Sequence, residues 1–181
     1  MLTKKSTLVL LAAALPLFAF GADALSHSDA SFLKDAREAG LYEVQGSKVA
    51  LQKGSDAQVK TFAQQMIDDH TKADQELEAL ASQKGVKLPT TPSMAMQAKL
   101  KTLEHWSQSG FDEHYADGVG VSAHKDTVKL FTKASTDAKD ADVKAFAAKT
   151  LPTLQHHLDM AQQLAASVKK SSSSGASAAS R

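Results

Sequence analysis

Two related stretches, Asp56-Ala-Gln-Val-Lys-Thr-Phe-Ala63 and Asp140-Ala-Asp-Val-Lys-Ala-Phe-Ala147, decide the fold of this chain. Each opens with an aspartate where a helix is expected to begin, since the positive end of a helix dipole favours a carboxylate. Each continues with apolar residues three and four positions apart, which is the helical period. Each also follows a short polar turn after another long periodic segment. The repeat therefore indicates two helical hairpins.

Outward from the repeat, the apolar period predicts long helices over residues 29–53, 56–84, 110–134 and 140–169, and a short helix over residues 94–106. Gly85 is expected to end the second helix, and Pro152 is expected to bend the fourth. Two hairpins bury their apolar stripes by packing together. The expected fold is all-α, a ferritin-like antiparallel four-helix bundle whose two hairpins are joined by a longer linker that carries the short extra helix.

The two ends of the chain differ from the bundle in composition. Residues 1–24 combine two lysines, an apolar run and small residues, which is typical of a signal peptide. An uncleaved membrane anchor is the alternative, although the apolar run is short for a span. We expect a bundle domain over residues 25–170, a disordered Ser/Ala-rich tail over residues 171–181, and a periplasmic or secreted bacterial protein without a transmembrane anchor after cleavage.

Charge and cysteine content exclude several classes of function. The 181 residues include 21 lysines and arginines against 20 aspartates and glutamates, and no cysteine. A chain without a basic surplus is not expected to bind nucleic acid. The absence of cysteine excludes disulfides, thiolate zinc sites and cysteine nucleophiles. Any metal site must therefore use histidine, carboxylate or methionine side chains.

Four ionisable residues are expected to face the interior of the bundle. Glu43 lies seven residues after Ala36, almost two turns along the apolar stripe of its helix. His70 and His157 lie within the apolar stripes of the second and fourth long helices. His124 lies on one of two apolar stripes of the third long helix, and Gly118 and Gly120 lie where one stripe gives way to the other.

Buried ionisable groups need partners, because an isolated buried charge is costly. We therefore expect Glu43, His70, His124 and His157 to bind one transition metal ion, which could be zinc, iron or copper. Asp69 and Tyr115 are candidates to orient a ligand from behind. A core hydrogen-bond network without metal is the alternative.

Methionine and catalytic motifs are weighed separately. Met66 and Met160 lie one helical turn from His70 and His157, and thioethers suit Cu(I), yet methionine at helical spacing is more often core filling. No Glu-x-x-His sequence is present, which argues against a di-iron carboxylate site. No Gly-x-Ser-x-Gly, His-Glu-x-x-His or phosphate-loop motif is present either, and we predict no catalytic residues.

Several motifs resemble those of the DUF4142 family of exported bacterial proteins. The stretch from Phe62 to His70 resembles its F-A-x-x-M-x-x-D-H motif, and Glu43 matches its helix-one glutamate. Phe111-Asp112 with Tyr115, and Leu151-Pro152 with His157-Leu158, match two further elements. The resemblance covers about residues 29–166 and implies export and a ferritin-like bundle, without implying an activity.

Two functions follow as hypotheses. The first is an exported bundle that binds a transition metal ion through its inward Glu and His residues and serves envelope stress or metal homeostasis. The second is a non-enzymatic module of the cell envelope that binds a protein or glycan partner, with the buried Glu and His residues forming only a structural network.

Overall fold

The computed structural model describes residues 25–179, and the signal peptide expected at residues 1–24 lies outside this range. The described part of the chain is helical throughout, with loops between the helices and no strand. The elements are α1 (His27–Lys53), α2 (Ala57–Gln83), α3 (Met94–His105), α4 (Gln108–Tyr115), the π-helix η1 (Ala116–Ser122), α5 (Ala123–Asp137) and α6 (Ala141–Ala179).

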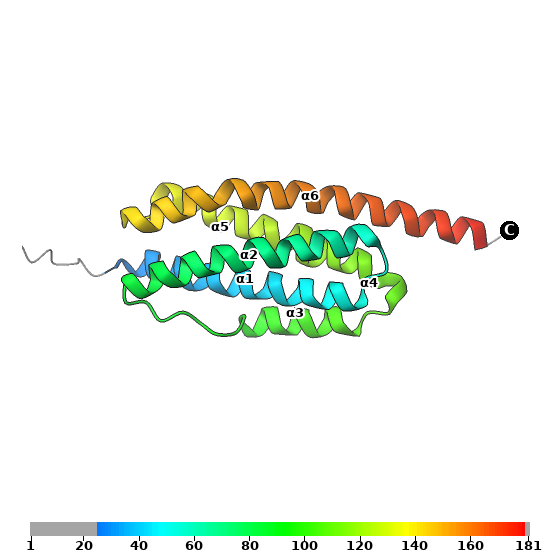
Figure 1. Cartoon of the computed structure of the whole chain (residues 1–181), viewed down its shortest axis with the longest axis horizontal. Helices are drawn as coiled ribbons and strands as arrows, with labels where there is room; N and C mark the ends of the chain where they lie inside the picture. The colour runs from blue at the N-terminus through cyan, green and yellow to red at the C-terminus, as the bar shows by residue number, and fades with distance from the viewer. Residues whose placement is uncertain (1–24, 180–181) are drawn as a thin grey trace, which may run out of the picture.

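The helices form two hairpins that pack against each other (Figure 1). One hairpin is α1 with α2, and the other is the continuous α4–η1–α5 rod with α6. Helix α1 lies against α5, and α2 lies against α6, so neighbouring helices among these four long elements are antiparallel. This is the four-helix bundle with one longer crossover that the sequence predicts. The expectation for the fold is confirmed.

The helix ends carry the capping residues that the repeat indicates. Asp56 accepts a hydrogen bond from the backbone N–H of Gln58 at 2.7 Å, and Asp140 accepts one from Asp142 at 2.9 Å. Helix α2 ends before Gly85, whose φ of 68° suits glycine. These caps fix where α2 and α6, the second helices of the two hairpins, begin. Gly85 ends α2, and the crossover begins after it.

Each hairpin also caps the turn of the other. The carboxylate of Asp29, near the start of α1, accepts the backbone N–H of Asp140 at 2.9 Å and that of Lys139 at 3.1 Å. The carboxylate of Asp112, in α4, accepts the backbone N–H of Asp56 at 2.9 Å and the hydroxyl of Ser55 at 2.5 Å. Two reciprocal charge-assisted contacts therefore hold the hairpins together at opposite ends of the bundle.

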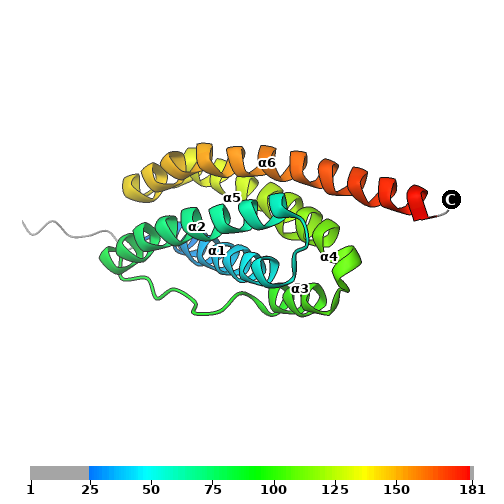
Figure 2. The same ribbon diagram turned by 45° about the vertical axis from the view of Figure 1, so that its right-hand side comes forward.

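The crossover lies along the first hairpin. Helix α3 packs on α1 at the side of the bundle (Figure 2). Its Leu100 and Leu103 are buried, and Lys53 Nζ at the end of α1 donates to the carbonyl oxygen of Trp106 at 2.9 Å. The extra helix predicted over residues 94–106 therefore exists and covers one face of α1.

The π-helix explains the two apolar stripes that the sequence shows along the α4–η1–α5 rod. Val119 and His124 are both buried but are five residues apart, which is the spacing of a π-helix. Before and at the start of η1, the buried face of the rod carries Phe111 and Tyr115. After η1, the buried face carries His124 and Phe131. Gly118 lies inside η1. The expected bend at the glycines is thus a change of helical phase within one continuous rod.

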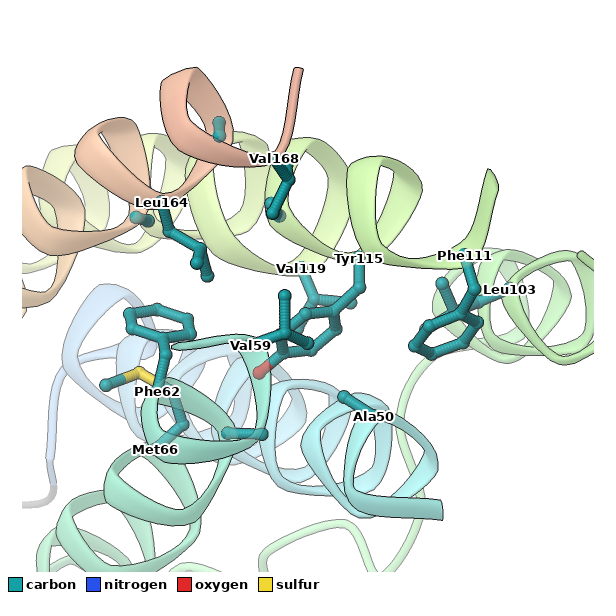
Figure 3. Packing of buried hydrophobic residues seen from close by; sticks show 14 of the residues in the cluster. Ala50, Val59, Phe62, Met66, Leu103, Phe111, Tyr115, Val119, Leu164 and Val168 are labelled. Carbon is teal, nitrogen blue, oxygen red and sulfur yellow. The ribbon is translucent and has the colours of Figure 1, made fainter. Parts of the chain in front are cut away.

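Two apolar clusters fill the bundle on either side of the four inward polar residues. One contains Phe32, Phe131 and Phe146, with the rings of Phe32 and Phe131 5.0 Å apart edge to face. The other is built around Phe62 and Tyr115 (Figure 3). Along α2, α5 and α6, each inward histidine lies between these clusters.

Helix α6 differs from the expectation at its C-terminal end. It continues to Ala179, where we expected residues 171–181 to form a disordered tail, and it runs on past the other helices (Figure 1). Ser171 and Ser172 return hydrogen bonds to the carbonyl oxygens one turn earlier, and the hydroxyl of Ser172 also contacts the Glu113 carboxylate of α4. Pro152 lies within α6 without ending it.

Among the described residues, none of the helices combines the length and the apolar character that a membrane crossing requires.

Candidate metal centre

The four inward residues predicted from the sequence meet in the middle of the bundle. Glu43 and His124 are 0% exposed, His157 is 1% exposed and His70 is 6% exposed. They come from α1, α5, α6 and α2 respectively. Adjacent ring centroids of the three histidines are 5.3–5.5 Å apart. The bundle therefore brings one polar side chain from each long helix to a single level.

His124 is oriented by the π-helix. Its Nδ1 donates to the carbonyl oxygen of Gly120 at 2.8 Å and lies 3.2 Å from that of Val119. A carbonyl can only accept, so the proton of neutral His124 is on Nδ1 and the lone pair is on Nε2. The unusual spacing of η1 thus both turns the ring inward and selects its tautomer.

His70 is oriented by Glu43. The Nδ1 atom of His70 lies 3.2 Å from Glu43 Oε2, which favours the ring proton on that nitrogen. Its Nε2 then points at His124, with 3.4 Å between the two Nε2 atoms. Two unprotonated nitrogens therefore face each other inside the protein.

His157 is oriented by Asp69. Its Nε2 donates to Asp69 Oδ2 at 2.9 Å, so Nδ1 carries the lone pair of the neutral ring. Within the described part of the chain, this buried Nδ1 has no hydrogen-bond partner. A buried polar atom without a partner costs free energy unless something else binds it.

The three rings together have the geometry of a metal site. Each offers one nitrogen, and these nitrogens all lie within 4.8 Å of one another. A tetrahedral ion that binds two imidazole nitrogens at roughly 2.0–2.1 Å holds them about 3.4 Å apart. The separation of the Nε2 atoms of His70 and His124 is 3.4 Å. His124 and His157 also have their other nitrogen hydrogen-bonded to a carbonyl or a carboxylate, as metal-ligating histidines have, and the other nitrogen of His70 lies 3.2 Å from the Glu43 carboxylate.

Glu43 lies behind the histidines. Its Oε1 accepts the hydroxyl hydrogen of Thr127 at 3.1 Å and lies 3.7 Å from His124 Nδ1. Both of its contacts to imidazole therefore go to Nδ1 atoms, away from the facing nitrogens. The three histidines form the group that is placed to hold an ion, whereas the position of Glu43 is that of a residue that orients them.

The two predicted orienting residues have different surroundings. Asp69 contacts His157, as the prediction requires. The hydroxyl of Tyr115 instead pairs with Ser47 Oγ at 2.8 Å, and its ring lies against Phe62. Tyr115 thus belongs to the adjoining core, where burial raises the pKa of its hydroxyl.

Comparison with known proteins identifies the family. The family described as "Domain of unknown function (DUF4142)" matches residues 17–164. The chain belongs to the DUF4142 family. The DUF4142 chain is also similar in structure to a DUF305 fragment from Deinococcus radiodurans, with a TM-score of 0.69 and 12% identity over 80% of this chain and 99% of that chain. This likeness shows a shared fold. None of the curated proteins compared with the chain matches it.

Burial sets the charge states in this DUF4142 site. It lowers the pKa of His70 well below its usual range, and the neighbouring His124 and His157 lower it further. Burial also lowers the pKa of His157, although Asp69 opposes this effect. Burial raises the pKa of Glu43, while His124 and Thr127 oppose the rise. At neutral pH, His70 and His157 are therefore uncharged and keep their lone pairs.

The methionines near the DUF4142 site belong to the core. Met66 is fully buried in the cluster around Phe62, and Met160 packs against that cluster. Packing thus accounts for both of them.

Two groups that contact the site residues are absent from the sequence prediction. They are the hydroxyl of Thr127, which contacts Glu43, and the carbonyl oxygens of η1, which contact His124. A signal for Thr127 exists in the repeat, because Asp140 follows Asp56 by 140 − 56 = 84 residues and Thr127 follows its partner Glu43 by the same 84. The two residues that hydrogen-bond at the centre therefore occupy equivalent positions in the two hairpins.

Proposed function

We propose that this DUF4142 protein is an exported helical bundle that binds one transition metal ion and serves metal homeostasis or envelope stress. His70, His124 and His157 are the proposed ligands, and Glu43 and Asp69 orient two of them. The observation that carries the proposal is the orientation of the rings. Each has one nitrogen beside a carboxylate or carbonyl and the other directed to a shared centre.

The donor set favours an ion that prefers imidazole. Three neutral imidazoles suit zinc, copper or iron, and the chain has no cysteine to compete for softer ions. A bound cation would also offset the cost of burying the Glu43 carboxylate. When bound, such an ion supplies Lewis acidity or redox chemistry, according to its identity.

Metal analysis of the purified mature chain tests the proposal. We expect about one equivalent of zinc, copper or iron per chain, and a higher melting temperature with added ion, since ligands that bind only the native state stabilise it. His157→Ala should abolish this binding. His156→Ala is the matched control, because its side chain is exposed and adjacent in sequence, and it should bind as the parent does.

If none of these ions binds to the chain or shifts its stability, the metal proposal fails. The buried residues would then be a structural network, and a module that binds a protein or glycan in the cell envelope becomes the better hypothesis. Export is tested separately by sequencing the N-terminus of the protein recovered from the periplasm or medium. Cleavage near residue 24 is expected.

A further inference from the structure

We propose that cations reach the three histidines through an acidic groove between α1 and α5 whose floor is the Glu43–Thr127 pair. The groove has a volume of about 200 Å³ and is lined along one side by α3. This inference rests on the proposed metal-binding function and adds to it the path, the rim and the residues that control uptake.

The rim of the groove is suited to attract cations. Asp35, Glu38 and Asp126 line it, against a single lysine, Lys99. Asp35 and Asp126 are exposed, and Glu38 is half-buried. Among the described residues, neither Glu38 nor Asp126 makes an ion pair, so their charges are not neutralised by neighbours. Such a concentration of one sign of charge raises the local concentration of counter-ions and their rate of association.

The floor of the groove is a buried carboxylate. Glu43 lines the groove although its side chain is 0% exposed. Among the described residues, its Oε2 makes no hydrogen bond of regular geometry, and its one ion-pair contact is with the Nδ1 of the proposed ligand His70, 3.2 Å away. An acceptor in this position provides a cation with its first protein contact below the rim.

A second, smaller pocket shares the Glu43–Thr127 pair with the groove. It has a volume of about 30 Å³, and its lining includes Glu43, Thr127 and His70. Glu43 and Thr127 line both spaces, so this pair lies between the groove and the space beside His70. The groove accommodates several waters, whereas the smaller pocket has room for about one. An ion must therefore lose hydration at the floor, where Glu43 replaces the lost oxygen ligands.

Thr127 can release Glu43 while keeping a hydrogen-bond acceptor of its own. Its Oγ1 lies within hydrogen-bonding distance of both Glu43 Oε1, at 3.1 Å, and the carbonyl oxygen of Ala123, at 3.0 Å. A hydroxyl has one hydrogen and can donate to only one of them at a time. When it donates to Ala123, Glu43 is released without leaving a buried donor unpaired.

Uptake kinetics of Co²⁺ test this route, because cobalt absorption reports binding to imidazole nitrogens directly. The test variant is Glu38→Gln with Asp126→Asn. The matched control is Glu104→Gln with Asp159→Asn, which removes the same charge from exposed residues that do not line the groove. We expect the test pair to slow association at low salt at least about three-fold relative to the control, with a dissociation constant within about two-fold of the parent.

Added salt should remove the difference between the two variants, since it screens exposed charges. Equal association rates in the test and control variants would overturn the route while leaving the metal site intact. Failure of the parent chain to bind Co²⁺, Zn²⁺, Cu²⁺ and Fe²⁺ would overturn the proposed function and the route together. The two failures are therefore distinguishable in one set of measurements.

Discussion

At the scale of single residues, the proposed metal centre depends on groups that contact the histidine nitrogens facing away from the shared centre. Asp69 is 40% exposed and contacts the buried His157. We expect Asp69→Ala to weaken metal affinity about 10- to 100-fold, because the ring of His157 loses the acceptor that fixes its tautomer. Isothermal titration with Zn²⁺ measures the effect. Asp68→Ala, at the exposed neighbouring position, should bind as the parent does, and equal affinities for the two variants would contradict the role of Asp69.

The buried histidines also predict how the metal-free protein responds to acid. The pKa values of His70 and His157 are lowered in the folded state, so the unfolded chain takes up protons first as the pH falls through about 6.5. Stability is therefore lost below that pH, with a limiting slope of about 1.4 kcal/mol per pH unit for each such proton. The raised pKa of Glu43 opposes this loss of stability, because the folded protein takes up a proton on Glu43 before the unfolded chain does. Glu43 is one group, whereas the two histidines act together in the other direction.

Urea unfolding of metal-free protein between pH 7.5 and 5.5 checks this prediction. The free energy of unfolding should fall over the range, and His70→Asn should make the fall shallower by removing one of the protons concerned. A parent protein whose stability rises as the pH is lowered would show that the assigned directions are wrong.

The site residues can be found from sequence, but their roles cannot. Each of His70 and His157 interrupts a regular apolar stripe, and a buried ionisable group on such a stripe requires a partner. Which ring nitrogen faces a carboxylate depends on the rotation of the side chain, which leaves no trace in the residue pattern. For the same reason the sequence predicts Glu43 as a ligand without showing that its carboxylate contacts the Nδ1 atoms of His70 and His124.

At the scale of the elements, the contact between α1 and η1 depends on a glycine. A Cβ added at Gly46 would lie 2.8 Å from Val119 Cγ2, closer than packed atoms allow. We expect Gly46→Ala to lower the free energy of unfolding by about 1–3 kcal/mol through overpacking. Gly40→Ala in the same helix meets nothing within 4 Å and should raise it by about 0.5–1 kcal/mol. Chemical denaturation of both variants decides, and a gain at both positions would exclude the close approach.

The long helices follow from the sequence, whereas the π-helix does not. Apolar residues at helical spacing, Gly85 and the two capping aspartates define α1, α2 and α6 to within a few residues, except at the C-terminus of α6. Along the α4–η1–α5 rod, the sequence shows only that the apolar stripe changes face near Gly118. A bend in an ordinary α-helix would explain that change as well as a π-helix does. The extra residue of a π turn has no composition of its own, so its position comes from tertiary packing.

At the scale of the whole molecule, the end of α6 lies outside the packed bundle. Val168 is buried, while residues 171–173 are exposed. Ending the chain after Ser173 should change the free energy of unfolding by less than about 0.5 kcal/mol, because residues 171–173, which lead into the removed segment, are already exposed. Ending it after Ser167 removes Val168 and should cost clearly more. Thermal unfolding of the two truncated proteins tests this, and equal losses would place residues 174–181 in the stabilised core.

The reciprocal aspartate contacts have a consequence for the order of assembly. Asp112, which caps the turn between α1 and α2, is synthesised after that hairpin, so the first half of a growing chain lacks the group that closes it. We expect the two halves, separated within the crossover, to be largely unfolded alone and to regain helix by circular dichroism when mixed. For the export proposed above, such a chain would stay open to threading through a translocation channel until Asp112 had been synthesised.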